Sequence, residues 1–261
     1  MGLVHAEASA VVEPFIGGMR LLATGVPGGY QKVGRGVVLN VIGLPSASTN
    51  TIHVLSPDAE RDDAEAYADE LAGAGLPFVV RERPGAPSWV GDLAAQRGLG
   101  RRADFPIMVM DEPTILTLTA GPRADVDSIV ELDGDALDLL PRVAEAFALG
   151  NELPRGVYDA LVGRRMVEQP GVAVYASLAG GAVTSVGIRL QVPGAVGVFG
   201  IATPPEHRRR GLGRAVTARI LADGVREGAT MAFLGASPMG FGIYQRLGFR
   251  VAERWIFHLP G

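Results

Sequence analysis

The chain has 261 residues, of which 48% are hydrophobic and 20% are charged, and its net charge is −4. This length can bury one large core or two modest ones. The absence of cysteine excludes disulfides, thiolate metal sites and a cysteine nucleophile. The negative net charge provides no global basic field for nucleic acid.

The chain shows no sign of a targeting or membrane segment. Its first residues lack the charged start and apolar run of a signal peptide. No uninterrupted apolar stretch reaches the roughly 18 residues of a membrane span. We therefore expect a soluble, cytoplasmic protein with no membrane partner.

The first half alternates predicted strands with predicted helices. A turn is expected at 26–30, strands at 36–44, 51–55, 77–83 and 105–111, and helices at 58–75 and 91–100. This alternation predicts a mixed α/β layer structure. Residues 111–126 contain several proline and glycine breaks and are interpreted as a connector. We place the boundary near residue 125, giving domains 1–125 and 126–261.

The second half begins with a helical stripe. Leu137, Leu140, Ala144 and Phe147 share one face, and Pro141 indicates that this helix begins or kinks there. The remaining elements are a helix at 151–165, strands at 172–178, 182–190 and 195–203, a helix at 208–228, a strand at 230–237, a helix at 238–247 and a strand at 248–259. The first three strands, joined by glycine-rich turns, predict an antiparallel meander.

The segment from Gly200 to Arg214 has the features of an anion-binding loop. A strand ends near Thr203, a loop rich in arginine and glycine follows, and a helix starts. Unpaired amides at a helix start attract phosphate, and the glycines at 211 and 213 remove obstructing side chains. Positive charge for the same anion comes from Arg208, Arg209, Arg210 and Arg214. The alternative is an ordinary surface turn, while the Rossmann and P-loop fingerprints do not fit.

Two motifs in this region resemble those of the GNAT acyltransferase superfamily. Residues 208–213 are similar to its R-x-x-G-x-G/A signature, and residues 201–205 look like the end of its fourth strand. Tyr244 opens Tyr-Gln-Arg-Leu-Gly-Phe, which is similar to the family's Y-x-x-L-G-F signature. The resemblance covers about residues 126–261. It implies a mixed, mostly antiparallel sheet flanked by helices.

The resemblance also implies an acetyl-CoA site. In this family the fourth and fifth strands splay apart around the thioester arm, and Tyr244 would be the general acid, its alternative role being a core aromatic. Ser237 stands where the family often has an asparagine that contacts pantetheine. The residues expected to hold coenzyme A are Ile201, Ala202, Thr203, Arg208, Arg209, Arg210, Gly211, Leu212, Gly213, Arg214 and Ser237.

The sequence departs from the family in its candidate base. Strand 195–203 has no carboxylate, so the base is a water chain, a residue from elsewhere, or absent. Glu206 and His207 fit ordinary loop residues better than catalysts. Five carboxylates near the expected acceptor site could hold a cationic amine, although solvated helix positions are the favoured interpretation of each: Asp133, Asp135, Asp138, Glu145 and Glu152.

The first half resembles the diverged N-terminal half of double-GNAT bacterial proteins, which predicts a two-domain pseudo-tandem arrangement. It would cover the open edge of the acyltransferase and shape its substrate cleft. Residues 98–102 place glycines before arginines and are interpreted as a loop, not a second CoA site. Trp89 fits a core position, with an acceptor pocket as its alternative.

Together these features predict an N-acetyltransferase that moves an acetyl group from acetyl-CoA to a small-molecule amine, without a metal. Longer acyl donors remain open. We expect a monomer or homodimer that binds no nucleic acid. The alternatives are a non-catalytic acyl-CoA-binding protein and a protein lysine or N-terminal acetyltransferase.

Overall fold

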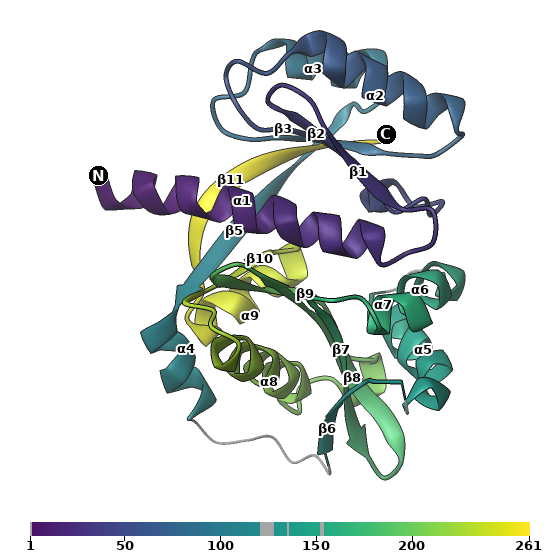
Figure 1. Ribbon diagram of the computed structural model, residues 1–261, viewed down its shortest axis with the longest axis vertical. Coiled ribbons are helices and arrows are strands. Elements are labelled where there is room, and N and C mark those ends of the chain that lie inside the picture. The colour runs from purple at the N-terminus through teal and green to yellow at the C-terminus, as the bar shows by residue number, and fades with distance from the viewer. Residues whose placement is uncertain (1, 121–127, 135, 152–153) are drawn as a thin grey trace.

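The computed structural model describes residues 2–120, 128–134, 136–151 and 154–261 (Figure 1). The α-helices are α1 (Gly2–Thr24), α2 (Arg61–Gly73), α3 (Trp89–Gln96), α4 (Glu112–Thr119), α5 (Leu140–Asn151), α6 (Arg155–Leu161), α7 (Arg164–Val167), α8 (Leu212–Arg226) and α9 (Pro238–Leu247). The strands are β1 (Tyr30–Val33), β2 (Val37–Val41), β3 (Asn50–Val54), β4 (Val79–Glu82), β5 (Arg101–Asp111), β6 (Ser128–Glu131), β7 (Val172–Ala179), β8 (Ala182–Val192), β9 (Ala195–Ala202), β10 (Met231–Gly235) and β11 (Arg250–Leu259). Within the described ranges, no helix is long and apolar enough to cross a bilayer.

The strands form one 11-stranded sheet in the order β1-β2-β3-β4-β11-β5-β10-β9-β8-β7-β6. The pairs β3–β4 and β9–β10 are parallel, and the other neighbours are antiparallel. This confirms the expected mixed, mostly antiparallel sheet, including the meander of β7, β8 and β9.

Both halves repeat one order of elements. Each has an antiparallel meander of three strands, a helix, a strand parallel to the last of them, a second helix and a final strand. These are β1–β3, α2, β4, α3 and β5 in the N-terminal half, and β7–β9, α8, β10, α9 and β11 in the C-terminal half. The repetition confirms the pseudo-tandem arrangement that the sequence suggested without detectable identity between the halves.

The final strands of the two halves are exchanged. β5 pairs with β10, β11 pairs with β4, and the two strands also pair with each other. Figure 1 shows them side by side between the upper, N-terminal part and the lower, C-terminal part. Each half therefore completes the sheet of the other. The chain boundary expected near residue 125 lies outside the described residues.

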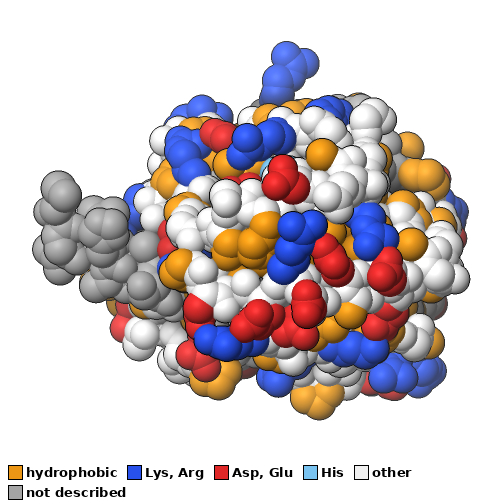
Figure 2. Space-filling view, turned by 90° about the horizontal axis from the view of Figure 1, so that it is seen from above, with side chains coloured by type: hydrophobic (Ala, Val, Ile, Leu, Met, Phe, Trp, Pro, Cys, Tyr) orange, Lys and Arg blue, Asp and Glu red, His pale blue; other side chains and the backbone are white. Residues whose placement is uncertain are grey.

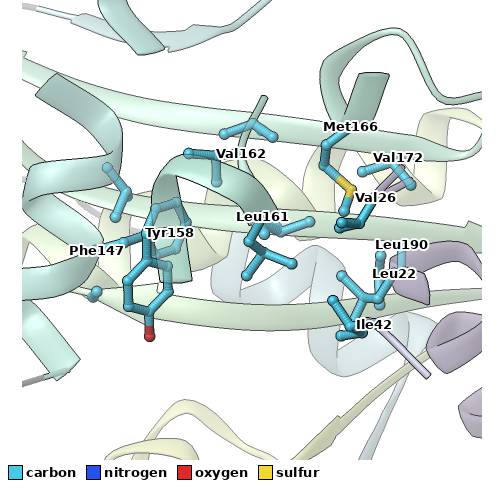
Figure 3. Packing of buried hydrophobic residues seen from close by; sticks show 14 of the residues in the cluster. Leu22, Val26, Ile42, Phe147, Tyr158, Leu161, Val162, Met166, Val172 and Leu190 are labelled. Carbon is cyan, nitrogen blue, oxygen red and sulfur yellow. The ribbon is translucent and has the colours of Figure 1, made fainter. Parts of the chain in front are cut away.

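The sheet is covered on both faces. On one face, α1 and α5–α7 pack over a core that spans both halves, whereas α4, α8 and α9 cover the opposite face in the C-terminal half. α2 and α3 cover a separate N-terminal core, against which Trp89 packs. Figure 3 shows the spanning core, where Leu22, Val26 and Ile42 of the first half meet Leu161 and Met166 of the second.

Several elements differ from the sequence expectations. The opening stretch, for which no element was expected, forms helix α1 despite Pro14, and its packing on the sheet stabilises it. The expected connector contains α4, which starts where Asp111 caps the Thr114 amide at 3.1 Å. The helix expected at 151–165 is present but shorter, as α6, and a second short helix, α7, follows it. The expected helix start near Pro141 is confirmed, because Pro141 is the second residue of α5, where the ring is tolerated.

Candidate functional site

β9 and β10 stop pairing with each other before either strand ends, and we call the stretch between their unpaired edges the slot. Their parallel pairing is limited to Ala195–Gly197 with Met231–Phe233. β9 nevertheless continues to Ala202, and β10 continues to Gly235. Residues Phe199–Ile201 are partly exposed after four buried residues. The facing edges of the two strands are therefore left without each other as partners.

A β-bulge at Gly200 accounts for the divergence. Ile188 of β8 faces Phe199, whereas Val186 faces Ala202, so two residues of β9 oppose one of β8. Gly200 has a φ of 60°, a left-handed conformation that glycine adopts without strain. A bulge bends its strand and increases the local twist, which carries β9 away from β10. Isolated glycine within a predicted strand is the sequence signal that could have indicated this bend.

The end of β9 presents its backbone to the slot. Ser185 Oγ donates a hydrogen bond of 2.9 Å to the carbonyl of Ala202, so this carbonyl faces β8. Neighbouring backbone groups alternate in direction along a strand, which turns those of Ile201 toward the slot. The Thr203 hydroxyl lies 2.9 Å from Ser185 Oγ, which fixes the strand end. Ser185 was not anticipated from the sequence.

Arg208 holds the loop that follows β9. Its guanidinium donates to the Thr203 carbonyl and to the Gly150 carbonyl of α5, each at 3.1 Å. The side chain thus ties the loop to a strand end and to a helix on the opposite face. Arg208 therefore positions the loop, and its expected contact with a bound diphosphate stays a prediction.

The first turn of α8 exposes unpaired amides. The earliest intrahelical bond joins the Ala215 amide to the Gly211 carbonyl at 3.0 Å. The amides of Leu212, Gly213 and Arg214 precede this bond and have no acceptor within the helix. Gly211, at the N-cap with a φ of 75°, offers no side-chain cap. Outward-pointing amides and the positive end of the helix dipole favour an anion here.

Arginines surround this helix start. Arg209, Arg210 and Arg214 are exposed, and within the described ranges none pairs with a carboxylate. Arg209 has a φ of 64° and is the one non-glycine residue in the described part of the chain with a left-handed backbone. Such a conformation costs about 1–3 kcal/mol and is often kept at binding loops. Gly211 and the neighbouring arginines are therefore accessible, and their binding of a diphosphate stays a prediction.

Helix α9 places Ser237 and Tyr244 beyond the end of β10. Ser237 is the N-cap of this helix, and its Oγ accepts a hydrogen bond from the Gly240 amide at 3.2 Å. Tyr244 packs edge-on against Phe249, with ring centroids 5.7 Å apart. Burial raises the pKa of Tyr244 to about 12. The phenol therefore keeps its proton at neutral pH, as a general acid requires.

The carboxylates considered for the acceptor site are dispersed. Asp133, Asp138 and Glu145 are exposed, and Glu145 pairs with Arg155 at 3.2 Å. Asp135 and Glu152 lie outside the described residues. Glu206 and His207 lie in a 3-10 turn (Pro205–His207), with 4.0 Å between them. Within the described ranges, no three metal-ligating side chains cluster.

The equivalent position in the N-terminal half is closed. β3 and β4 pair from Thr51–Val79 to Val54–Glu82, and the Arg83 amide extends this pairing to the Val54 carbonyl. The Arg83 guanidinium then bonds to the Leu55 carbonyl at 3.2 Å and to Glu253 at 2.7 Å. These contacts fill the place where the C-terminal half has its slot.

The helix that follows β3 is unsuited to an anion. The first turn of α2 carries Asp62 and Asp63, and the preceding residues Asp58 and Glu60 bind Arg35. The Asp63 carboxylate accepts the Arg35 amide at 2.7 Å. Figure 2, a view from above this half, shows acidic and basic side chains interspersed on its surface. Carboxylates at this helix start would repel a diphosphate.

Helix ends α3 and α9 correspond residue by residue. Leu99 and Phe249 donate their amides to the carbonyls of Ala94 and Tyr244, at 2.9 and 3.0 Å. In each turn a left-handed glycine, Gly98 or Gly248, precedes the donor. Ala94 therefore occupies the place of Tyr244. The loop expected at 98–102 is confirmed only for residues 98–100, because Arg101 and Arg102 already belong to β5.

A family model supports the assignment from sequence. Residues 181–252 match the model described as an acetyltransferase (GNAT) domain. The chain contains a GNAT domain. This match covers β8 to the first part of β11 and includes the slot, the start of α8 and Tyr244. The GNAT domain is completed by β5, which comes from the diverged N-terminal half.

Solved structures share the fold of the GNAT domain and its N-terminal half. A GCN5-related N-acetyltransferase from Kribbella flavida has a TM-score of 0.63 and 15% identity, with 94% of each chain covered. A GCN5-related N-acetyltransferase-like protein from Streptococcus suis has a TM-score of 0.59 and 14% identity, with 88% of each chain covered. A tandem GNAT protein from the clavulanic acid biosynthesis pathway has a TM-score of 0.55 and 20% identity, covering 85% of this chain and 77% of that one. No curated protein sequence matches the chain.

Proposed function

We propose that this protein is an N-acetyltransferase that transfers an acetyl group from acetyl-CoA to a primary amine of a small molecule. The observation that carries this proposal is the slot between β9 and β10, which ends beside the uncapped start of α8. An extended pantetheine arm needs strand edges with free hydrogen-bonding groups, and a diphosphate needs convergent amides. Both requirements meet in one part of the GNAT domain.

The donor is proposed to bind along this line. The backbone groups of Ile201, and those hydrogen-bonding groups of Thr203 that are not already bonded, would pair with pantetheine. The buried side chains of Ala202 and Leu212 support the site. The amides from Gly211 to Arg214 would hold the diphosphate, and the exposed guanidiniums of Arg209, Arg210 and Arg214 would neutralise it. Ser237 Oγ accepts the Gly240 amide but keeps its hydroxyl proton for a pantetheine group.

The proposed chemistry is direct attack by a neutral amine on the thioester carbonyl. A carbon–nitrogen bond forms, the carbon–sulfur bond breaks, and the leaving thiolate takes a proton from Tyr244. Burial raises the pKa of Tyr244 to about 12, so the phenol is protonated at neutral pH before the thiolate forms, and water would return the proton after each transfer. Since β9 has no carboxylate, water is proposed to carry away the proton that the amine loses.

A small acceptor is favoured over a protein by the covering of the sheet. α1 packs across β8, β9, β10 and β11, and α5 packs on β8 and β9, on the face opposite α8. Phe147 approaches Gly200 from that face: a β-carbon added to the glycine would lie 3.1 Å from its ring. This cover would restrict access to the slot from the face of α1 and α5, which favours a small acceptor over a folded protein.

The proposal is tested by incubating the purified protein with acetyl-CoA and a panel of small amines while free thiol is measured. We expect amine-dependent thiol release that Tyr244→Phe lowers without a comparable loss of CoA affinity. Tight CoA binding without turnover across the panel would favour the non-catalytic alternative. Transfer to lysines or N-termini of added proteins, detected by mass spectrometry and absent with small amines, would favour the protein acetyltransferase.

A further inference from the structure

A buried arginine lies under α1 in the N-terminal half, away from the slot. Arg81 is in β4, at the centre of this part of the sheet, and only 6% of its surface is accessible. Its guanidinium carbon lies 4.8 Å from the ring centre of Phe105 and 4.5 Å from that of Phe257. Phe15 of α1 covers the group at 5.8 Å. An aromatic cage thus surrounds the cation.

This cation has no counter-charge in the described part of the chain. Arg81 Nε has no hydrogen-bond partner there, and Nη1 has only the Met19 sulfur at 3.7 Å. Burial lowers the pKa of Arg81 to about 9, and no carboxylate opposes this effect. Arg189, another buried arginine, differs because Glu227 pairs with it at 2.5 Å. A buried charge without a counter-ion is strongly unfavourable.

A second unpartnered group lies beside Arg81. His53 is the direct neighbour of Arg81 across the β3–β4 pair, and it is fully buried. Neither of its ring nitrogens has a hydrogen-bond partner in the described ranges. The rings of Phe15 and Trp255 meet it edge-on, with centroids 6.3 and 6.1 Å away. A neutral imidazole still has one N–H to donate.

We propose that Arg81 and His53 bind a small monovalent anion, of the size of chloride or formate, beneath helix α1. Such an anion would accept hydrogen bonds from Arg81 Nε–H and from the imidazole N–H, and it would neutralise the guanidinium. A water molecule could satisfy the hydrogen bonds but would leave the charge uncompensated. The anion would tie α1 to the N-terminal sheet independently of coenzyme A.

The test uses thermal unfolding of the full chain without CoA. Sodium chloride or sodium formate replaces sodium gluconate at constant ionic strength, since gluconate is too bulky for the site. A ligand that binds only the folded state raises the melting temperature. Once the ligand concentration exceeds the Kd, the rise is proportional to the logarithm of that concentration. We expect this rise in the native chain and in Arg20→Met, which removes an exposed arginine of α1. We expect no rise in Arg81→Met. A rise with chloride alone or formate alone identifies the preferred ion.

Equal slopes for the native chain and Arg81→Met would overturn the proposal. If Arg81→Met does not fold, His53→Phe, which keeps the aromatic volume but removes the donor, is expected to reduce the slope at least about threefold. Diffraction from bromide-soaked crystals then gives an independent result. An anomalous peak between Arg81 and His53 supports the site, and a fully occupied water at that position contradicts it.

Discussion

The two parallel strand pairs, β3–β4 and β9–β10, have the same place in the repeated topology, but one pair is hydrogen-bonded to its end and the other is not. β9 and β10 separate after three paired positions, whereas β3 and β4 remain paired to their ends and are closed by Arg83. In the proposed function, binding therefore depends on local departures from regular structure, not on the fold that both halves share.

Three local differences separate the halves. The C-terminal half has a bulge at Gly200, a glycine-led and arginine-rich start of α8, and a tyrosine on α9. The N-terminal half has uninterrupted pairing, an acidic start of α2 and Ala94 in the place of that tyrosine. Because β5 and β11 are exchanged, the N-terminal half still contributes a strand beside β10. Its present contribution is therefore structural support for the slot.

The largest effect is expected from Gly211→Val. A β-branched residue at a φ of 75° is strained, and its side chain would occupy the place of the diphosphate. We expect CoA affinity to fall about 1,000-fold, or about 4 kcal/mol, by calorimetry. Glu60→Val, at the N-cap of α2 in the other half, is the matched control and should leave the affinity unchanged. Native affinity in Gly211→Val would show that this turn does not hold the phosphates.

Tyr244→Phe is expected to lower kcat about 100-fold while changing CoA affinity less than about threefold, because only proton donation is lost. Free thiol released over time measures kcat, and calorimetry measures CoA affinity. Because the pKa of Tyr244 is raised to about 12, the phenol should stay protonated through pH 9. The part of kcat that depends on its proton should fall only when the pH approaches that pKa. Tyr30→Phe in the N-terminal half is the control. Unchanged kcat in Tyr244→Phe would remove the acid role.

Arg83→Met tests whether the closed slot is sealed by an ion pair. Removing one partner of a fully buried pair costs about 3–5 kcal/mol, but 22% of the Arg83 side chain is accessible, so we expect about 2–3 kcal/mol in urea unfolding. Adding Glu253→Gln to Arg83→Met should recover part of this loss, since no charged carboxylate is then left without its partner.

Arg83→Met should bind no second CoA, because the acidic start of α2 remains. Native stability would mean that strand pairing alone closes the slot.

The smallest effect is expected from Ser237→Ala. Loss of a helix cap costs about 1 kcal/mol in unfolding free energy. Asp111→Ala, which removes the cap of α4, should cost a similar amount. If Ser237 also contacts pantetheine, only Ser237→Ala will raise the KM for acetyl-CoA. Equal KM values in the two variants would restrict Ser237 to capping.

The sequence pointed to the motif-bearing parts of the candidate site but not to the residues that support them. Gly211 and Tyr244 could be recognised because each lies in a short motif, and the residues of such a motif are neighbours in the sequence. The bulge at Gly200, the Ser185 bond and the inward turn of Arg208 depend on partners far along the chain. The exchange of β5 and β11 has no local sequence signal either. The same pattern of buried residues would allow each strand to pair within its own half or with the other half.

The most direct test of this account is the stoichiometry of CoA binding to the full chain by isothermal titration calorimetry. We predict one CoA per chain, lost in Gly211→Val and retained in Glu60→Val. Two equivalents per chain, or one equivalent that survives Gly211→Val, would contradict the claim that only the separated strands beside α8 form a coenzyme site.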